Sequence, residues 1–183
     1  MFQEQTFKLG IAGIPAQGLD LALTLEPRWF EQWREEDPSL DFNAPEGLTL
    51  KLLVQKHGRD LLLRGSLGGT LDFACSRCLT RFGLAVEGAF DLLLVPGPAP
   101  VSGREEELSA DDLSLDYYTG DELDLGAIIK EQILLLIPLK PLCAEDCSGL
   151  CPRCGADLNR GACACPAEES TSPFAVPART EKS

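Results

Sequence analysis

The order of apolar and polar residues predicts an antiparallel sheet in the first half of the chain. Apolar residues alternate with polar ones from Leu48, and after a turn at residues 57–59 the alternation continues to Leu67. This period of two is typical of a β-hairpin with one buried face. A second turn is predicted at residues 66–69 (SLGG), where two glycines follow each other. The clearest strand runs from Arg81 to Val95, so the CSRC motif at 75–78 is predicted to form a turn between antiparallel strands.

Two other segments have the apolar spacing of helices. Residues 27–37 begin with proline at a favourable first helical position and place Trp29 and Trp33 one turn apart. These indole rings could stack on bases, but we expect them to cover an edge of the core. Asp124 can cap a second helix, whose apolar residues repeat at helical spacing and which ends before Pro138. We expect this helix to pack on the sheet and to lead the chain to Cys143.

Shorter elements complete the predicted fold. Residues 7–15 and 19–25 each alternate loosely and indicate short strands, and Leu113, Leu115 and Tyr117 indicate another. Residues 96–112, rich in proline, glycine and acids, have no apolar period and are predicted to form a loop. The pattern therefore predicts an α+β fold: a mainly antiparallel β-sheet with a packed helix, followed by a C-terminal cysteine-rich zinc knuckle.

The zinc prediction rests on eight cysteines. Closely spaced cysteines in a reducing compartment are typical of metal ligation rather than of disulfides, and tetrahedral zinc takes four ligands, so we expect two zinc ions. The last four cysteines are close enough in sequence to bind one ion without the rest of the protein. The first site is therefore predicted to contain Cys75, Cys78, Cys143 and Cys147. The knuckle is predicted to contain Cys151, Cys154, Cys163 and Cys165.

Other cysteine chemistries fit the sequence less well. Cys147, Cys151 and Cys154 have the CxxxCxxC spacing of an iron–sulfur cluster that cleaves S-adenosylmethionine, but only 29 residues follow, too few for the barrel. A redox dithiol in CSRC would lack the thioredoxin-like βαβ pattern. A zinc-held redox switch, as in redox-regulated chaperones, stays open as an alternative. The single histidine, His57, lies in a predicted turn, so we expect no catalytic site and no small-molecule substrate.

The charge distribution has two features. The net charge of −13 disfavours a protein that coats nucleic acid indiscriminately, and nine acids crowd residues 104–124. Residues 51–82 nevertheless carry six cations against two acids. These cations could contact nucleic-acid phosphates or could equally be solvated charges at strand edges. They are Lys51, Lys56, Arg59, Arg64, Arg77 and Arg81.

With these motifs, the chain resembles the YceD family, the large ribosomal RNA subunit accumulation proteins. The resemblance begins near residue 48 and rests on CSRCL at 75–79, LDLGAIIKEQILLLIPLKP at 123–141, the cysteine segment and SPFAVPA at 172–178. It implies a bacterial, non-enzymatic factor for the accumulation of 23S-type rRNA and for large-subunit assembly. The implied partner is a pre-large-subunit particle, contacted through rRNA, through a basic ribosomal protein that meets the acidic segment, or through both.

The expected division of the chain follows from the same motifs. We expect a core domain at 1–142 that includes the CSRC turn, a cysteine-rich zinc-binding segment at 143–165 and a flexible tail at 166–183. The tail departs from the family, which tends to continue after PFAV with a leucine-rich end. The start of the sequence has no basic-then-apolar pattern and no apolar run approaches about 20 residues, so we expect a cytoplasmic protein without membrane contact.

Overall fold

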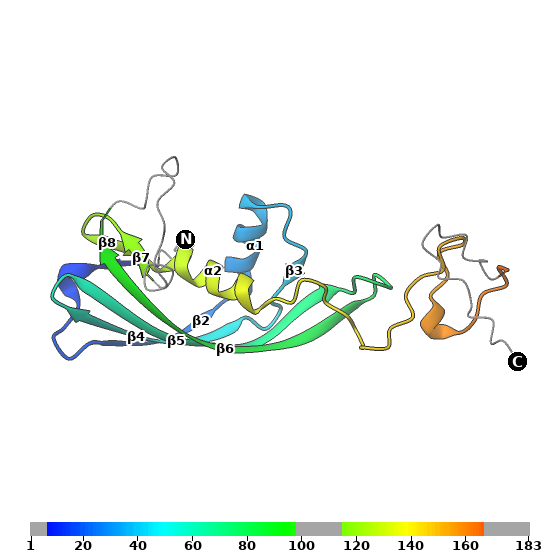
Figure 1. Cartoon of the computed structure of the whole chain (residues 1–183), viewed down its shortest axis with the longest axis horizontal. Helices are drawn as coiled ribbons and strands as arrows, with labels where there is room; N and C mark the ends of the chain where they lie inside the picture. The colour runs from blue at the N-terminus through cyan, green and yellow to red at the C-terminus, as the bar shows by residue number, and fades with distance from the viewer. Residues whose placement is uncertain (1–6, 98–114, 167–183) are drawn as a thin grey trace, which may run out of the picture.

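The computed structural model describes residues 7–97 and 115–166 (Figure 1). Its strands are β1 (Lys8–Gly10), β2 (Leu19–Leu25), β3 (Phe42–Asn43), β4 (Leu48–His57), β5 (Asp60–Ala74), β6 (Arg81–Pro96), β7 (Leu115–Tyr118) and β8 (Glu122–Asp124). Its helices are α1 (Pro27–Glu36) and α2 (Leu125–Leu136), with 3-10 turns η1 (Ile11–Gly13) and η3 (Leu158–Arg160). Among the described residues, no helix has the length and apolar character needed to cross a membrane.

In the described part of the chain, the main sheet has six strands and is mostly antiparallel, as the sequence predicts. The strand order is β2-β4-β5-β6-β7, and β3 pairs with the far end of β5. Among the strands that the structure describes, only β7 runs parallel to its neighbour, β6, so the sheet is mixed at that edge. β1 and β8 form a separate two-stranded sheet. The predicted loop at 96–112 falls almost wholly outside the described residues.

The predicted turn at residues 66–69 is wrong, because β5 continues through it. Its pairing with β6 is unbroken from Leu61 to Ala74. Gly69 in this segment and Gly65 just before it make room for neighbouring side chains instead of reversing the chain. A Cβ on Gly65 would lie 2.2 Å from Cζ of Phe90, and one on Gly69 would lie 2.6 Å from Cδ2 of Leu48.

Both helices lie on the same side of the sheet in Figure 1 and enclose the core against it. Every second residue of β4 from Leu48 to Val54 is buried there, which confirms the predicted alternation. Trp29 and Trp33 of α1 are buried in this core, as expected. The carboxylate of Asp124 accepts a hydrogen bond from the backbone nitrogen of Ala127 at 3.1 Å and caps α2, also as predicted.

Candidate metal centres

The CSRC turn joins β5 to β6 and fixes the first two cysteines. The backbone nitrogen of Leu79 donates to the carbonyl of Cys75 at 2.9 Å, and the nitrogen of Cys75 donates to the carbonyl of Thr80 at 2.9 Å. The nitrogen of Arg77 also points at the Cys75 sulfur, 3.5 Å away. The turn therefore holds both sulfurs on its inner side and supplies N–H donors to one of them, as metal-binding cysteine turns do.

The other two cysteines arrive when the chain returns after α2. The backbone nitrogen of Ser76 donates to the carbonyl of Pro141 at 2.9 Å, which fastens this segment to the turn. The Sγ atoms of Cys75 and Cys147 are then 3.7 Å apart, and those of Cys78 and Cys143 are 3.6 Å apart. Four sulfurs around tetrahedral zinc, with Zn–S bonds of about 2.3 Å, lie about 3.8 Å from one another. We call these four residues the sheet site; their arrangement fits such an ion.

The remaining four cysteines form a second group, which we call the terminal site. Its four sulfurs lie within 4.8 Å of one another, as do those of the sheet site. The groups are the two sets of four predicted from the sequence, namely Cys75, Cys78, Cys143 and Cys147, and Cys151, Cys154, Cys163 and Cys165.

The terminal site repeats the backbone turn of the sheet site. The nitrogen of Gly155 donates to the carbonyl of Cys151 at 2.9 Å, and the nitrogen of Cys151 donates to the carbonyl of Ala156 at 2.8 Å. Gly155 therefore occupies the place that Leu79 has in the sheet site. Their φ angles are +71° and +60°, and Leu79 is the only non-glycine residue with positive φ in the part of the chain that the structure describes.

Within each group, thiol pKa values are shifted in opposite directions. Burial raises the pKa of Cys75, but N–H donors from Cys143, Cys78 and Arg77 outweigh it and lower the pKa to about 6. N–H donors from Cys154 and Arg153 likewise lower the pKa of Cys151 to about 6.

One thiol in each group is shifted in the opposite direction. The pKa of Cys143 rises to about 12, chiefly through its hydrogen bond with Cys78, and that of Cys165 rises to about 12 through Cys154. Four neighbouring thiols cannot all ionise without a cation. A divalent metal would supply the missing positive charge, which is why metal binding to such groups releases protons.

Two residues connect the groups. The side chain of Asn159, from the loop of the terminal site, donates to the Cys147 sulfur at 3.4 Å. The carbonyl of Arg77 accepts from the nitrogen of Leu150 at 3.2 Å, while its guanidinium donates to the carbonyl of Cys147 at 2.8 Å. The sheet and terminal sites are thus neighbours with shared hydrogen bonds.

The structure does not gather the six predicted phosphate-contacting cations into one patch. Lys51 and Arg64 lie together on the sheet face that the helices leave open, where Arg64 is 3.6 Å from Asp91. Lys56 and Arg59 are at the hairpin between β4 and β5, at the opposite end of the sheet from CSRC. Arg77 is engaged at the sheet site by its bonds to backbone carbonyls.

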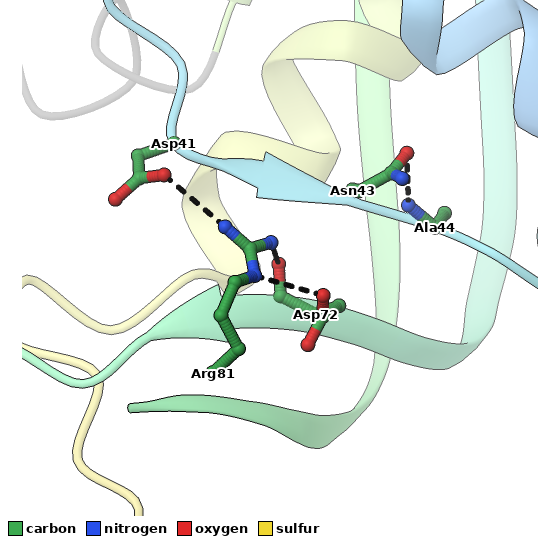
Figure 2. Close-up of polar contacts among 5 residues, drawn as sticks. All are labelled: Asp41, Asn43, Ala44, Asp72 and Arg81. Carbon is green, nitrogen blue, oxygen red and sulfur yellow. Dashed lines mark hydrogen bonds and ion pairs between the residues drawn. The ribbon is translucent and has the colours of Figure 1, made fainter. Parts of the chain in front are cut away.

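Arg81 is held between two carboxylates (Figure 2). Its guanidinium donates to Asp72 at 2.9 Å and to the backbone carbonyl of that residue at 2.8 Å, and it reaches Asp41 at 3.4 Å. It ties the loop before β3 to the paired ends of β5 and β6, beside the sheet site. Arg81 therefore has a structural partner that the sequence did not reveal.

Two residues near the metal centres were missed by sequence reasoning. Asn159 carried no signal beyond its position between the paired cysteines of the terminal site. Leu79 could have been found, because it follows CxxC where Gly155 follows the corresponding motif. A bulky residue at a position that favours glycine is an observable departure.

Comparisons with known proteins agree with these features. Residues 63–176 match the family model described as "Large ribosomal RNA subunit accumulation protein YceD". An uncharacterized protein of Mycobacterium tuberculosis is 30% identical over 111 residues, which are 61% of this chain and 51% of that protein. The chloroplastic "Large ribosomal RNA subunit accumulation protein YCED homolog 1" of Arabidopsis thaliana is 26% identical over 148 residues, 68% of this chain and 46% of that protein.

The chain thus spans about half the length of the curated relatives it matches. No solved structure matches it significantly. The family match covers more than half of the chain and includes all eight cysteines that build the two sites. The chain belongs to the YceD family.

Proposed function

We propose that this protein is a non-enzymatic assembly factor that supports the accumulation of large-subunit (23S-type) rRNA, and that its two cysteine groups hold structural zinc. The observation that carries the zinc proposal is the convergence of all eight cysteine sulfurs into two sets of four. The role in ribosome assembly is carried by the family, whose description names large-subunit rRNA accumulation. The descriptions of the family and of its chloroplastic member favour this function over that of a redox-responsive zinc chaperone.

The zinc ions would act as cross-links and not as reaction centres. In the sheet site, an ion would join the end of the β5–β6 hairpin to the segment that follows α2, two parts of the chain about 65 residues apart in sequence. Zinc binding contributes about 10–16 kcal/mol in small peptides that fold around it. The ligands of the sheet site would be Cys75, Cys78, Cys143 and Cys147, and those of the terminal site Cys151, Cys154, Cys163 and Cys165.

The proposed domain division keeps the expected boundaries, with a core at 1–142, a zinc-binding segment at 143–165 and a tail from 166. Residues 167–183 lie outside the described part of the chain. Because Cys143 and Cys147 contact the CSRC turn, the zinc-binding segment would be fixed to the core at its beginning. The two parts would then bind a partner as one unit.

The proposed partner is a precursor of the large ribosomal subunit in the bacterial cytoplasm. Lys51 and Arg64 are exposed and line the same hollow of the open sheet face, and they are the best-placed cations for rRNA phosphates, although Arg64 also pairs with Asp91. Lys56 and Arg59 could make a second contact at the far hairpin. Arg77 and Arg81 would contribute less, since their guanidinium groups already bond within the protein.

Sedimentation of the tagged full-length chain tests this function. In a sucrose gradient of cell extract at low salt, the protein should migrate with precursors of the large subunit. Cells that lack it should accumulate less large-subunit rRNA relative to small-subunit rRNA. Recovery of the protein only at the top of the gradient, together with unchanged rRNA levels, would refute the proposal.

A further inference from the structure

An apolar groove lies directly beside the sheet site. It has a volume of about 450 Å³ and is bounded by the loop before β3, the CSRC turn, the end of α2 and the segment after it. The apolar side chains that line it include Leu40, Phe42, Phe73, Leu79, Leu134 and Leu139. Its bottom is continuous with the core, because Phe42 and Phe73 are buried.

Three leucines at the groove are unusually exposed. The exposed fractions are 65% for Leu79, 47% for Leu134 and 102% for Leu139. Among the described residues, the other exposed large apolar side chains are Leu93 and Leu135. Exposed apolar side chains that gather around a concave surface mark binding sites more often than isolated ones do. The gathering therefore marks this groove as a candidate docking surface.

Leu79 adds an independent reason. The same turn in the terminal site has Gly155 at the matching position, with nearly the same hydrogen bonds and a similar positive φ. A left-handed conformation is unfavourable for leucine and free of steric cost for glycine. The side chain of Leu79 is exposed, so packing within this protein does not compensate for its strain. Strain of this kind gathers at functional sites.

The charge of the whole chain selects the class of partner. Asp41 lines the groove, Asp72 precedes the lining residue Phe73, and Arg81 binds both carboxylates. A hydrogen bond from Ser39, which lines the groove, lowers the pKa of Asp37 and keeps it ionised. Lys140 follows Leu139 and Arg77 follows Ser76, so two further cations adjoin residues that line the groove. The acids and cations near the groove therefore balance, and it is the net charge of −13 on the whole chain that disfavours RNA and favours a positively charged protein segment.

We propose that this groove binds an apolar side chain of a basic protein, in a segment where lysine or arginine flanks the apolar anchor. This inference rests on the proposed function, because a precursor of the large subunit offers such basic proteins. The sheet site would hold the groove open: Cys75 lines it, and the bond from Ser76 to Pro141 sets the position of its outer wall.

A matched pair of variants on α2 and its extension tests the groove. Leu139→Glu places a charge at a fully exposed groove residue and should leave the fold intact. Leu135→Glu is the control, since Leu135 is 72% exposed but does not line the groove. With purified precursor particles, we expect Leu139→Glu to bind at least about tenfold more weakly than the unaltered protein and Leu135→Glu to bind like it.

Photo-crosslinking identifies the occupant. Benzoylphenylalanine at position 139 of the full-length chain should crosslink, on these particles, to a basic ribosomal protein at an apolar residue with lysine or arginine nearby. Adducts to rRNA, to a second copy, or to residues 172–178 of the same chain would overturn the inference. Unaltered binding by Leu139→Glu would also overturn it while leaving the proposed function standing. The proposed function fails separately, if the unaltered protein does not bind the particles.

Discussion

The amide of Asn159 donates a hydrogen bond to the sulfur of Cys147, 3.4 Å away, so a residue from the loop of the terminal site contacts a cysteine of the sheet site. The same side chain accepts from the nitrogen of Ser148 at 2.8 Å, and Asp157 fixes its amide nitrogen at 2.7 Å. Asn159 is therefore held on both sides and cannot turn away without loss of these bonds.

Asn159→Ala should weaken zinc binding at the sheet site, although Asn159 is not one of the proposed zinc ligands. Removal of a hydrogen bond to a metal ligand typically lowers metal affinity about 10–100-fold. Chelator competition on the zinc-loaded protein would measure the release of each ion. Arg153→Ala, an exposed change in the same small module, is the control and should release both ions as the unaltered protein does. If Asn159→Ala binds zinc in the sheet site as tightly as the unaltered protein does, the hydrogen bond from Asn159 to Cys147 has no effect on metal affinity.

Leu79→Gly should stabilise the zinc-loaded protein and weaken its binding to precursor particles. Glycine removes the strain of a left-handed leucine, which is about 1–2 kcal/mol. It also adds conformational freedom to the unfolded chain, which lowers the free energy of unfolding by about 0.5–1 kcal/mol. Urea denaturation would measure this gain. The converse change, Gly155→Leu, should destabilise the terminal site. A clear loss of stability in Leu79→Gly would mean that the Leu79 side chain stabilises the fold by packing against other residues.

Gly65→Ala should destabilise the sheet, because its Cβ would lie 2.2 Å from the ring of Phe90. Overpacking of this kind costs about 1–3 kcal/mol. Gly68→Ala on the open face is the control, since the nearest atom to its Cβ is 3.8 Å away. Phe90→Leu should recover part of the loss when it is combined with Gly65→Ala, and additive effects in this double-mutant cycle would contradict direct contact.

The sequence predicted those features that depend on spacing alone. Alternation gave the long strands, the helical repeat gave α2, and the short reach from Cys151 to Cys165 separated the two cysteine groups. The turn predicted at 66–69 failed because glycine serves two purposes: it reverses chains, and it also makes room, as Gly69 does for Leu48. Spacing does not distinguish these uses.

Other features depend on contacts between distant segments. The bond between Asn159 and Cys147, the clamp of Arg81 on Asp41 and the groove beside Leu79 each join parts of the chain that no local pattern relates. The parallel pairing of β7 with β6 has the same origin, because a four-residue strand can pair in either direction until the fold positions it.

The zinc content of the purified protein and of two variants tests the central claim most directly. Native mass spectrometry should find two zinc ions in the unaltered protein and one in each of Cys75→Ser and Cys151→Ser. The sheet should stay folded in Cys151→Ser, with an unchanged β-type circular dichroism spectrum. A single zinc ion in the unaltered protein would contradict the division of the eight cysteines into two metal sites.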